Sequence, residues 1–278
     1  MEKPWIVVRG AGDLATGVIV RLVRCGFRVC ALECGNPSAI RRKAAFCEAV
    51  WQGSMEVEGL TCVRIARPEE ADTIWQQGKI PLLVEETGAA ISALQAAAVV
   101  DAIIAKKNLG TNREMAPITV GLGPGFTAGE DVDAVVETMR GHHLGRVILE
   151  GSAIANTGIP GNIGGFTSQR VIHAPDSGTM TFVADEAGKT IDIGAVVKEG
   201  QIIARVGQTP VCATLTGVLR GLIREGYPVT KGLKIADIDP RLEQAAFCDT
   251  VSDKARSIGG GVVEALLFLA EKKQIQLL

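Results

Sequence analysis

The sequence predicts an α/β protein in which a doubly wound parallel sheet is followed by a small all-β module and a C-terminal helix. Strand-like and helix-like segments alternate up to about residue 150, which is typical of right-handed βαβ units. From residue 171 onward the segments are short and turns recur about every eight to twelve residues, which favours an all-β unit. The stretch 252–272 has the spacing of one more helix. We therefore expect three parts, at 1–167, 168–245 and 246–278.

The first part begins with a strand, a glycine turn and a helix. The apolar run Trp5–Arg9 passes into the turn at 10–17 and then into a helical pattern. This arrangement aims the first amides of a helix at an anion, because the unpaired N–H groups and the helix dipole both favour negative charge. We expect Gly10 to permit the tight turn, Gly12 to let a phosphate approach, and Ala15 to allow close helix–strand packing.

The second predicted strand, at 27–32, ends at Glu33, about 20 residues after the glycines. An acid at this position can accept a hydrogen bond from a ribose hydroxyl, as in Rossmann-like domains. The predicted ligand is therefore nucleotide-like, with NAD(P) as one candidate. The alternative is a tight turn that binds nothing, with Glu33 as a solvated strand end. The residues assigned to this site are Gly10, Gly12, Asp13, Leu14, Ala15 and Glu33.

The remaining elements of the first part follow from apolar periodicity. Further strands are expected at 61–65, 80–84, 118–122 and 145–149, and helices at 67–77, 92–107 and 131–140, with a short helix after residue 36. Ligands of such sheets bind beyond the carboxyl ends of the strands. Glycine-rich or acidic segments follow several of these strands, and we expect them to line one cleft. These segments are 10–12, Glu33, Glu85 with Glu86, 123–125, and Glu150 with Gly151.

A second glycine-rich turn follows the predicted strand at 118–122. Gly123, Gly125 and Phe126 belong to it. One interpretation makes this turn a second wall of the cleft that offers amides to an anion. The other makes it a structural loop that needs glycine for its backbone angles.

Three further groups of residues are candidates for chemistry. Arg41, beside two other cations, either clamps an extra phosphate near Glu33 or lies on a solvated helix face. Cys34 and Cys248 are weak candidates for reactive thiols. The pair His142–His143 is expected at the amino ends of the strands, away from the cleft, in a structural or interfacial role.

Composition excludes several classes of protein. The 278 residues carry a net charge of −2 and only 4% aromatic residues, which disfavours nucleic-acid binding. No apolar run approaches the length of a membrane span, and the N-terminal stretch lacks the pattern of a secretory signal. Seven cysteines without zinc-site spacing and three histidines predict a cytoplasmic protein with free thiols and no metal centre.

The all-β part contains an internal repeat. Residues 174–204 and 213–236 share a pattern of turns and apolar positions, which suggests two interlocked hairpin units around one core. The region resembles the biotinyl/lipoyl-like barrel-sandwich family. Carriers of that family hold their prosthetic group on a lysine of the hairpin that joins the halves, and the matching hairpin at 207–210 has none. A covalent carrier is therefore excluded.

In the last helix, three glycines at 259–261 predict a break or a close contact, and we expect this helix to dock on the first part.

The segments at 9–17, 123–129, 137–142 and 234–241 together resemble the YqeB-type accessory proteins of selenium-dependent molybdenum hydroxylase systems. The resemblance covers most of the chain. It implies a role in maturing a molybdenum hydroxylase apoenzyme, which would be the partner, and in handling a molybdopterin-type cofactor or its selenium or sulfur ligand. That cofactor is the second candidate ligand, beside NAD(P). It supplies no catalytic residues. Two alternatives stay open: an NAD(P)-dependent oxidoreductase, and a non-catalytic scaffold for the hydroxylase. Homo-oligomers are compatible with each.

Overall fold

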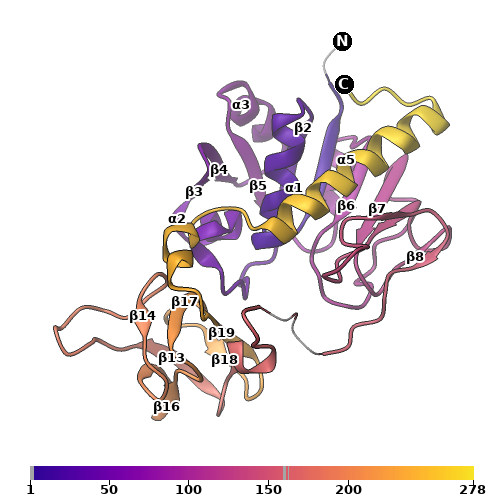
Figure 1. The fold of residues 1–278 in the computed structure, drawn as a ribbon. Helices are drawn as coiled ribbons and strands as arrows, with labels where there is room; N and C mark the ends of the chain where they lie inside the picture. Colours follow the sequence, from indigo (N-terminus) through magenta and orange to yellow (C-terminus); the bar gives the residue numbers. More distant parts are fainter. Residues whose placement is uncertain (1–2, 159–160, 162) are drawn as a thin grey trace. The chain divides into compact units, whose positions relative to one another are not determined.

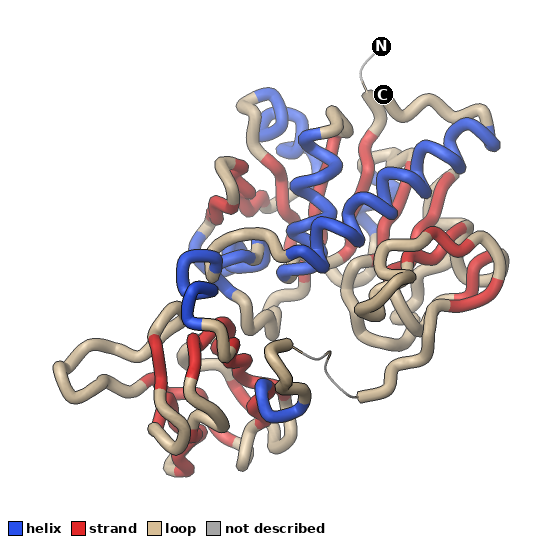
Figure 2. The backbone as a smooth tube through the Cα atoms, viewed as in Figure 1, coloured by secondary structure: helices blue, strands red, loops and turns tan. Residues whose placement is uncertain are grey.

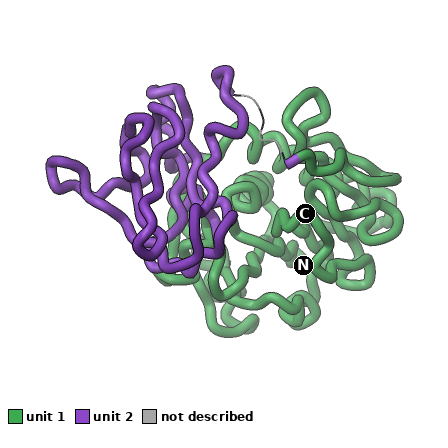
Figure 3. Tube along the Cα trace, turned by 90° about the horizontal axis from the view of Figure 1, so that it is seen from below, with its two compact units in different colours: residues 1–37, 45–157, 251–278 green, residues 38–44, 158–250 purple. Residues whose placement is uncertain are grey.

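The computed structural model describes residues 3–158, 161 and 163–278 (Figures 1 and 2). The fold is mixed α/β, with a large and mostly parallel sheet, antiparallel sheets and a C-terminal helix. The chain divides into two compact units (Figure 3). Unit 1 comprises Met1–Pro37, Ala45–Thr157 and Val251–Leu278, and unit 2 comprises Ser38–Ala44 and Gly158–Thr250. The last helix thus groups with the first part of the chain, and residues 38–44 group with the all-β part.

Unit 1 is built on a nine-stranded sheet with the order β10-β9-β7-β6-β1-β2-β5-β4-β3. Neighbouring strands run parallel, except that the outer strands β3 and β10 are antiparallel to their partners. The strand order changes direction at β1, which has β2 on one side and β6 on the other. The strands are β1 (Trp5–Arg9), β2 (Arg28–Glu33), β3 (Ser54–Val57), β4 (Leu60–Ile65), β5 (Ile80–Val84), β6 (Ala98–Asp101), β7 (Ile118–Leu122), β9 (Ala134–Val136) and β10 (Val147–Ile148).

Helices cover both faces of this sheet, which is why its central strands are buried. All residues of β1 and β7 are buried, as expected for parallel strands between two helical layers. Trp5 and Val7 of β1 face a core that also contains residues of α3 (Ala71–Gln76) and α4 (Ala89–Ala93). On the other face lie α1 (Asp13–Arg24) and α5 (Asp253–Lys273), which contact each other extensively (Figure 1). Smaller elements are α2 (Ala49–Gln52) and the strand pair β8 (Thr127–Ala128) and β11 (Gly151–Ser152).

Glycines set the close approach of α5 to the rest of unit 1. The helix is continuous through its three glycines. A Cβ added at Gly259 would lie 2.9 Å from the carbonyl oxygen of Gly17 in α1, and one added at Gly261 would lie 2.0 Å from the carbonyl oxygen of Gly145. A Cβ at Gly17 would lie 2.5 Å from that of Ala255. Close contact, rather than a break, therefore explains two of the three glycines.

Two helices expected from the sequence are absent, and strands take their place. In the segment 92–107, α4 ends at Ala93 and is followed by the fully buried strand β6, paired with β1 and β7. In the segment 131–140, the buried strand β9 pairs with β7. Both predictions were wrong because short apolar runs do not distinguish a buried strand from a helix, and pairing within the sheet decided between them.

The end of the sheet also differs from expectation. The last strand, β10, is only Val147–Ile148 and returns antiparallel beside β9. The turn between them, which contains His142 and His143, therefore lies at the carboxyl end of β9. The expected position at the amino ends of the strands was wrong. Instead of one short helix after residue 36, the structure has the 3-10 turns η1 (Arg42–Ala44) and η2 (Phe46–Glu48).

Unit 2 contains two four-stranded antiparallel sheets, β12-β19-β17-β14 and β16-β15-β13-β18. Each half of the internal repeat contributes two strands to each sheet. Each strand of one half has a counterpart at the same place in the other half. Exchanging every strand for its counterpart converts the strand order of the first sheet into that of the second, so the halves interlock around one apolar core. The strands are β12 (Val171–His173), β13 (Gly178–Phe182), β14 (Val196–Val197), β15 (Ile202–Val206), β16 (Thr209–Cys212), β17 (Gly217–Leu222), β18 (Pro228–Val229) and β19 (Lys234–Asp239). The 3-10 segment η5 (Leu242–Phe247) follows them.

Candidate functional site

The glycine turn lies at the carboxyl end of β1, where the strand order of the sheet changes direction. Gly10 has φ +99°, and a Cβ there would lie 2.9 Å from the carbonyl oxygen of Ala102. Glycine is therefore required at position 10 for two reasons. The turn needs a positive φ, and the segment after β6 leaves no room for a side chain. Gly12 has φ −63° and no atom within 4 Å of an added Cβ. Open space therefore lies beside Gly12, at the position where such sheets bind ligands.

The first turn of α1 presents its amides on this open side. Gly12 is the N-cap, and its carbonyl accepts the first helical bond from the amide of Thr16, over 2.7 Å. The amides of the first turn have no acceptor within a helix, and glycine has no side chain to supply one. Asp13 and Leu14 are partly exposed, whereas Ala15 is buried. The helix dipole and these donors favour an anion at this end of α1, although the carboxylate of Asp13 already gains from the same dipole.

Glu33 holds the turn from the neighbouring strand. One oxygen of its carboxylate accepts the amide of Ala11 and the other accepts the amide of Cys34, each over 2.8 Å. The amide of Gly10 also donates to the carbonyl of Leu32 over 2.7 Å. Because a carboxylate has about four acceptor positions, Glu33 keeps capacity for a further donor. The structure thus brings the predicted ribose acceptor and the glycine turn together.

A buried polar cluster next to this turn was missed by the sequence analysis. Asp101, at the end of β6, accepts hydrogen bonds from Thr111 Oγ1 over 2.5 Å and from the amide of Ile103 over 3.1 Å. Arg9, at the end of β1, lies 3.6 Å from the same carboxylate and donates to Thr111 and to the carbonyl of Glu86. Burial raises the pKa of Asp101, opposed by these hydrogen bonds and by Arg9. The sequence did contain a signal for this cluster, because each of two apolar strands ends in a charged residue, Arg9 in β1 and Asp101 in β6.

The side chain of Glu85 accepts hydrogen bonds from amides at the start of α4. Its carboxylate accepts the amide of Gly88 over 2.8 Å and that of Ala90 over 3.3 Å, and it also bonds to Thr87. Burial disfavours the charged form, but these hydrogen bonds outweigh it and lower the pKa of Glu85. The acid that was expected to line the cleft is thus committed to a helix end.

The second glycine-rich turn is tightly packed. The amide of Gly123 donates to the carbonyl of Val136, and a Cβ on Gly123 would lie 2.4 Å from Thr138 Oγ1. A Cβ on Gly125 would lie 2.6 Å from the Cα of Lys107. Phe126 is buried in a small apolar cluster. These contacts favour the structural interpretation of the loop, and its use as a wall of a ligand site stays a prediction.

Arg41 lies in unit 2, where it is buried. Its Nη2 donates to the carbonyl of Thr250 over 3.1 Å and to that of Phe247 over 3.5 Å. The two following cations behave similarly, since Arg42 donates to the carbonyl of Leu222 and Lys43 to that of Ile193. The side chain of Arg41 is therefore not on a solvated helix face. The segment 38–44 is fastened to β17 and to loops of unit 2 instead.

Neither candidate thiol is activated. Burial, followed by the charge of Glu33, raises the pKa of Cys34 to about 11. Burial also raises the pKa of Cys248, although Arg41 and Arg220 oppose this effect. Both groups are therefore protonated at neutral pH, and a thiol in that form is a poor nucleophile. All seven cysteines are free.

The histidine-containing turn borders a cavity of about 220 Å³ that His143 lines together with Glu137, Arg146 and Ser152. The carboxylate of Glu137 accepts the amides of Met139 and Ile154, over 2.6 and 2.8 Å, so it braces the turn. Larger cavities, of about 710 and 400 Å³, lie beside Met115 and Trp5 and do not include the glycine turn.

The fold and this geometry define an α/β protein with a candidate anion site at a helix N-terminus. Over 264 residues, 95% of its length, the chain is 50% identical to the uncharacterized protein YqeB of Escherichia coli strain K12, and it is a homologue of that protein over this region. The chain spans about half the length of this curated relative, since the match covers 47% of it. No family model matches the chain.

Among solved structures, the product-bound ectoine utilization protein EutE (DoeB) from Ruegeria pomeroyi is similar at 14% identity over 85% of each chain, with a TM-score of 0.24. A likeness this low supports no conclusion about fold or function. Among the described residues, no helix combines the length and the apolar character that crossing a bilayer requires.

Proposed function

We propose that unit 1 binds a nucleotide or a molybdopterin-type cofactor through a phosphate at the N-terminus of α1. The observation that carries this proposal is the position of Gly12. It begins a twelve-residue helix at the carboxyl end of the central strand, with no atom within 4 Å of where a side chain would be. A phosphate that fills this space gains amide donors and the helix dipole together.

Glu33 supports a ligand that carries a ribose or a similar diol. Its carboxylate is oriented by Ala11 and Cys34 and retains acceptor capacity. NAD(P) and the dinucleotide form of a molybdopterin both contain such a group next to a phosphate. Arg41, assigned to an extra phosphate by the sequence, is bound to carbonyl groups in unit 2, so this proposal does not use it.

The wider role that we propose is maturation of a selenium-dependent molybdenum hydroxylase in the cytoplasm. It is supported by the sequence resemblance and by the identity to YqeB, whose own function is uncharacterized. We further propose that unit 2 is a barrel-sandwich module that docks on the hydroxylase apoenzyme. The interlocked order of its two sheets supports that architecture.

Substitution of Gly12 tests the anion site in a way that separates binding from folding. Aspartate is a favoured N-cap residue, and Gly12 has ordinary backbone angles and open space. Gly12→Asp should therefore leave the protein as stable as the wild type or more so, while its carboxylate repels a phosphate. Gly12→Ser is the matched control, because it caps the helix without adding charge.

The measurements are mass spectrometry of small molecules released from the purified protein, and calorimetric titration with NAD(P)H and pterin dinucleotides. We expect a phosphate-bearing ligand whose affinity is lost in Gly12→Asp and largely kept in Gly12→Ser. Hydride transfer from bound NAD(P)H would assign an oxidoreductase instead. Hydroxylase binding that survives Gly12→Asp, with no ligand detected, would assign a scaffold. Equal ligand binding by wild type and Gly12→Asp would refute the site.

A further inference from the structure

The cavity beside the histidine-containing turn is lined by polar side chains that the fold of unit 1 leaves unused. His143 and Arg146 line it and are exposed, and neither side chain makes a hydrogen bond or an ion pair within the described part of the chain. Ser152 adds a hydroxyl that lies 3.1 Å from Thr127 Oγ1. The adjacent His142 is not among the lining residues. The cavity thus includes one histidine of the pair, together with an unpaired cation.

Glu137 holds two walls of this cavity together. It is buried, and the two oxygens of its carboxylate accept the amides of Met139 and Ile154. These bonds join the turn after β9 to the segment after β11. Among the described residues Glu137 has no ion pair, so its negative charge is stabilised by amides alone. Because a carboxylate has about four acceptor positions, Glu137 retains capacity for a further donor.

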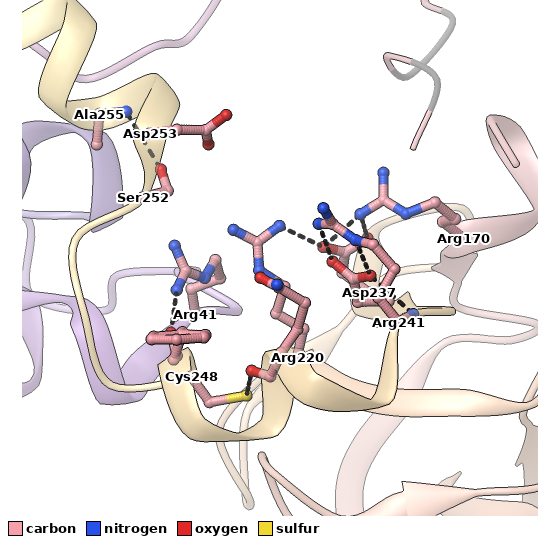
Figure 4. Close-up of polar contacts among 12 residues, drawn as sticks. Arg41, Arg170, Arg220, Asp237, Arg241, Cys248, Ser252, Asp253 and Ala255 are labelled. Carbon is pink, nitrogen blue, oxygen red and sulfur yellow. Dashed lines mark hydrogen bonds and ion pairs between the residues drawn. The ribbon is translucent and has the colours of Figure 1, made fainter. Parts of the chain in front are cut away.

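The histidine-containing turn is also anchored to α5. Arg140 pairs with Asp253 in the first turn of that helix, over 2.7 and 3.0 Å. One turn further along, Ser257 Oγ donates to the carbonyl of Leu144 over 3.0 Å. The helix is itself capped by Ser252, whose hydroxyl accepts an amide of the first turn (Figure 4). The backbone of this wall is therefore held in place before any ligand binds, which lowers the cost of binding.

The remaining part of the cavity is apolar. Ile148 and Ile154 line it. Ile148 packs against the small cluster that contains Phe126, whereas Ile154 is 47% exposed. A ligand that covers Ile154 removes apolar surface from water. The volume of about 220 Å³ equals that of about seven waters at about 30 Å³ each, so it suits a ligand of about seven non-hydrogen atoms.

These groups complement one chemical class of ligand. A guanidinium pairs with a carboxylate through two hydrogen bonds, and a carboxylate with free acceptor positions binds an ammonium group. A simple anion would be repelled by Glu137, and a simple cation by Arg146. We propose that the cavity binds the zwitterion of a small aliphatic α-amino acid. Its carboxylate pairs with Arg146 and His143, its ammonium group with Glu137, and its side chain contacts the two isoleucines.

This site is distinct from the anion site proposed at the glycine turn. In the sheet, β9 is separated from β1 by β7 and β6, which corresponds to roughly 14 Å at the usual spacing of about 4.8 Å between strands. Gly12→Asp should therefore leave amino-acid binding unchanged. Failure of either proposal leaves the other standing.

The probe is L-2-aminobutyrate, titrated calorimetrically into the full chain, with butyrate and butylamine as analogues that each carry one charge. We expect the amino acid to bind saturably and at least about tenfold more tightly than either analogue, because each analogue lacks one charged contact. Arg146→Gln should weaken the binding about tenfold or more for the same reason. Arg146→Lys should fall between the two, since it keeps the charge and loses the fork.

The two adjacent histidines provide a matched control. His143→Ala should weaken binding about threefold or more, whereas His142→Ala should not, because His142 lies outside the cavity lining. In the wild type, the methyl NMR signals of Ile148 and Ile154 should shift on addition of the amino acid, which locates the ligand without any variant. The proposal would be overturned by an absence of saturable binding at millimolar L-2-aminobutyrate, by equal affinity for butyrate, or by unchanged affinity in Arg146→Gln.

Discussion

The carboxylate of Glu33 accepts a hydrogen bond from the backbone amide of Ala11 over 2.8 Å. This bond joins the end of β2 to the glycine turn after β1. It orients an acidic side chain beside the N-terminus of α1, where a ligand with a phosphate and a ribose needs both a donor set and an acceptor. The same bond contributes to folding, because it satisfies an amide in a tightly packed turn.

Removal of the Glu33 carboxylate should therefore affect stability as well as binding. We expect Glu33→Ala to lower the free energy of unfolding by about 1–3 kcal/mol, because the amides of Ala11 and Cys34 lose their acceptor. Glu33→Gln should cost less, since its amide oxygen can still accept one of them. Denaturant titration measures the change, with Glu56→Ala on the exposed side of β3 as the control. Equal effects of the two alanine substitutions would contradict this role.

Adjacent glycines in α5 should respond to alanine in opposite directions. A Cβ at Gly261 would lie 2.0 Å from the carbonyl oxygen of Gly145, so we expect Gly261→Ala to destabilise the protein by about 1–3 kcal/mol or more. At Gly260 no atom lies within 4 Å, and Gly260→Ala should stabilise it by about 0.5–1 kcal/mol through helix propensity. Thermal unfolding of both variants tests the pair. A loss of stability in Gly260→Ala as large as that in Gly261→Ala would show that close packing is not the cause.

Asp133 should make stability depend on pH in the acidic range. Burial disfavours its charged form, but hydrogen bonds and ion pairs with Lys273, Thr119 and Arg113 prevail and lower its pKa. The carboxylate therefore contributes stability that is present above the pKa of the unfolded state, about 3.9, and is lost as the pH falls through the lower folded pKa. Asp133→Asn should be less stable than the wild type at neutral pH.

The difference between wild type and Asp133→Asn should shrink as the pH falls below about 4. Urea titrations between neutral and acidic pH measure it. Glu130→Gln, at an exposed position in the same loop, should show no such convergence. A gap that stays constant down to acidic pH would rule out the proposed contribution of the Asp133 charge.

Arg42 should stabilise unit 2, although it lies far from the β-strands of that unit along the chain. Its Nε donates to the carbonyl of Leu222 over 2.7 Å, its Nη2 pairs with Asp192, and its guanidinium lies 5.4 Å from the centre of the Phe182 ring. We expect Arg42→Ala to cost about 1–3 kcal/mol and to increase hydrogen exchange in β17. Arg205→Ala is the control, and similar exchange in both variants would show that segment 38–44 does not brace unit 2.

Local sequence predicted the beginning of unit 1 well, and contacts between distant segments decided most of the rest. The strand β1, the turn at Gly10 and the helix α1 follow from residues that are neighbours in the chain. The strand β6 was predicted to be helical because Ala98–Asp101 has no alternation to reveal it, and only its place between β1 and β7 makes it a strand. The positions of Arg41 and of the histidine turn likewise depend on which strands pair.

The sequence by itself determined the alternation of strands and helices in the first half, the glycine turn with an acid at the end of the next strand, and the repeat in the second half. These are features of residue type and spacing, and local backbone preferences express them directly. Tertiary structure decided that Glu33 bonds to Ala11, that Asp101 is buried beside Arg9, and that Arg42 donates to the carbonyl of Leu222. Such relationships arise when strands far apart in the chain pair, because hydrogen bonds and burial then act between residues that no local pattern connects.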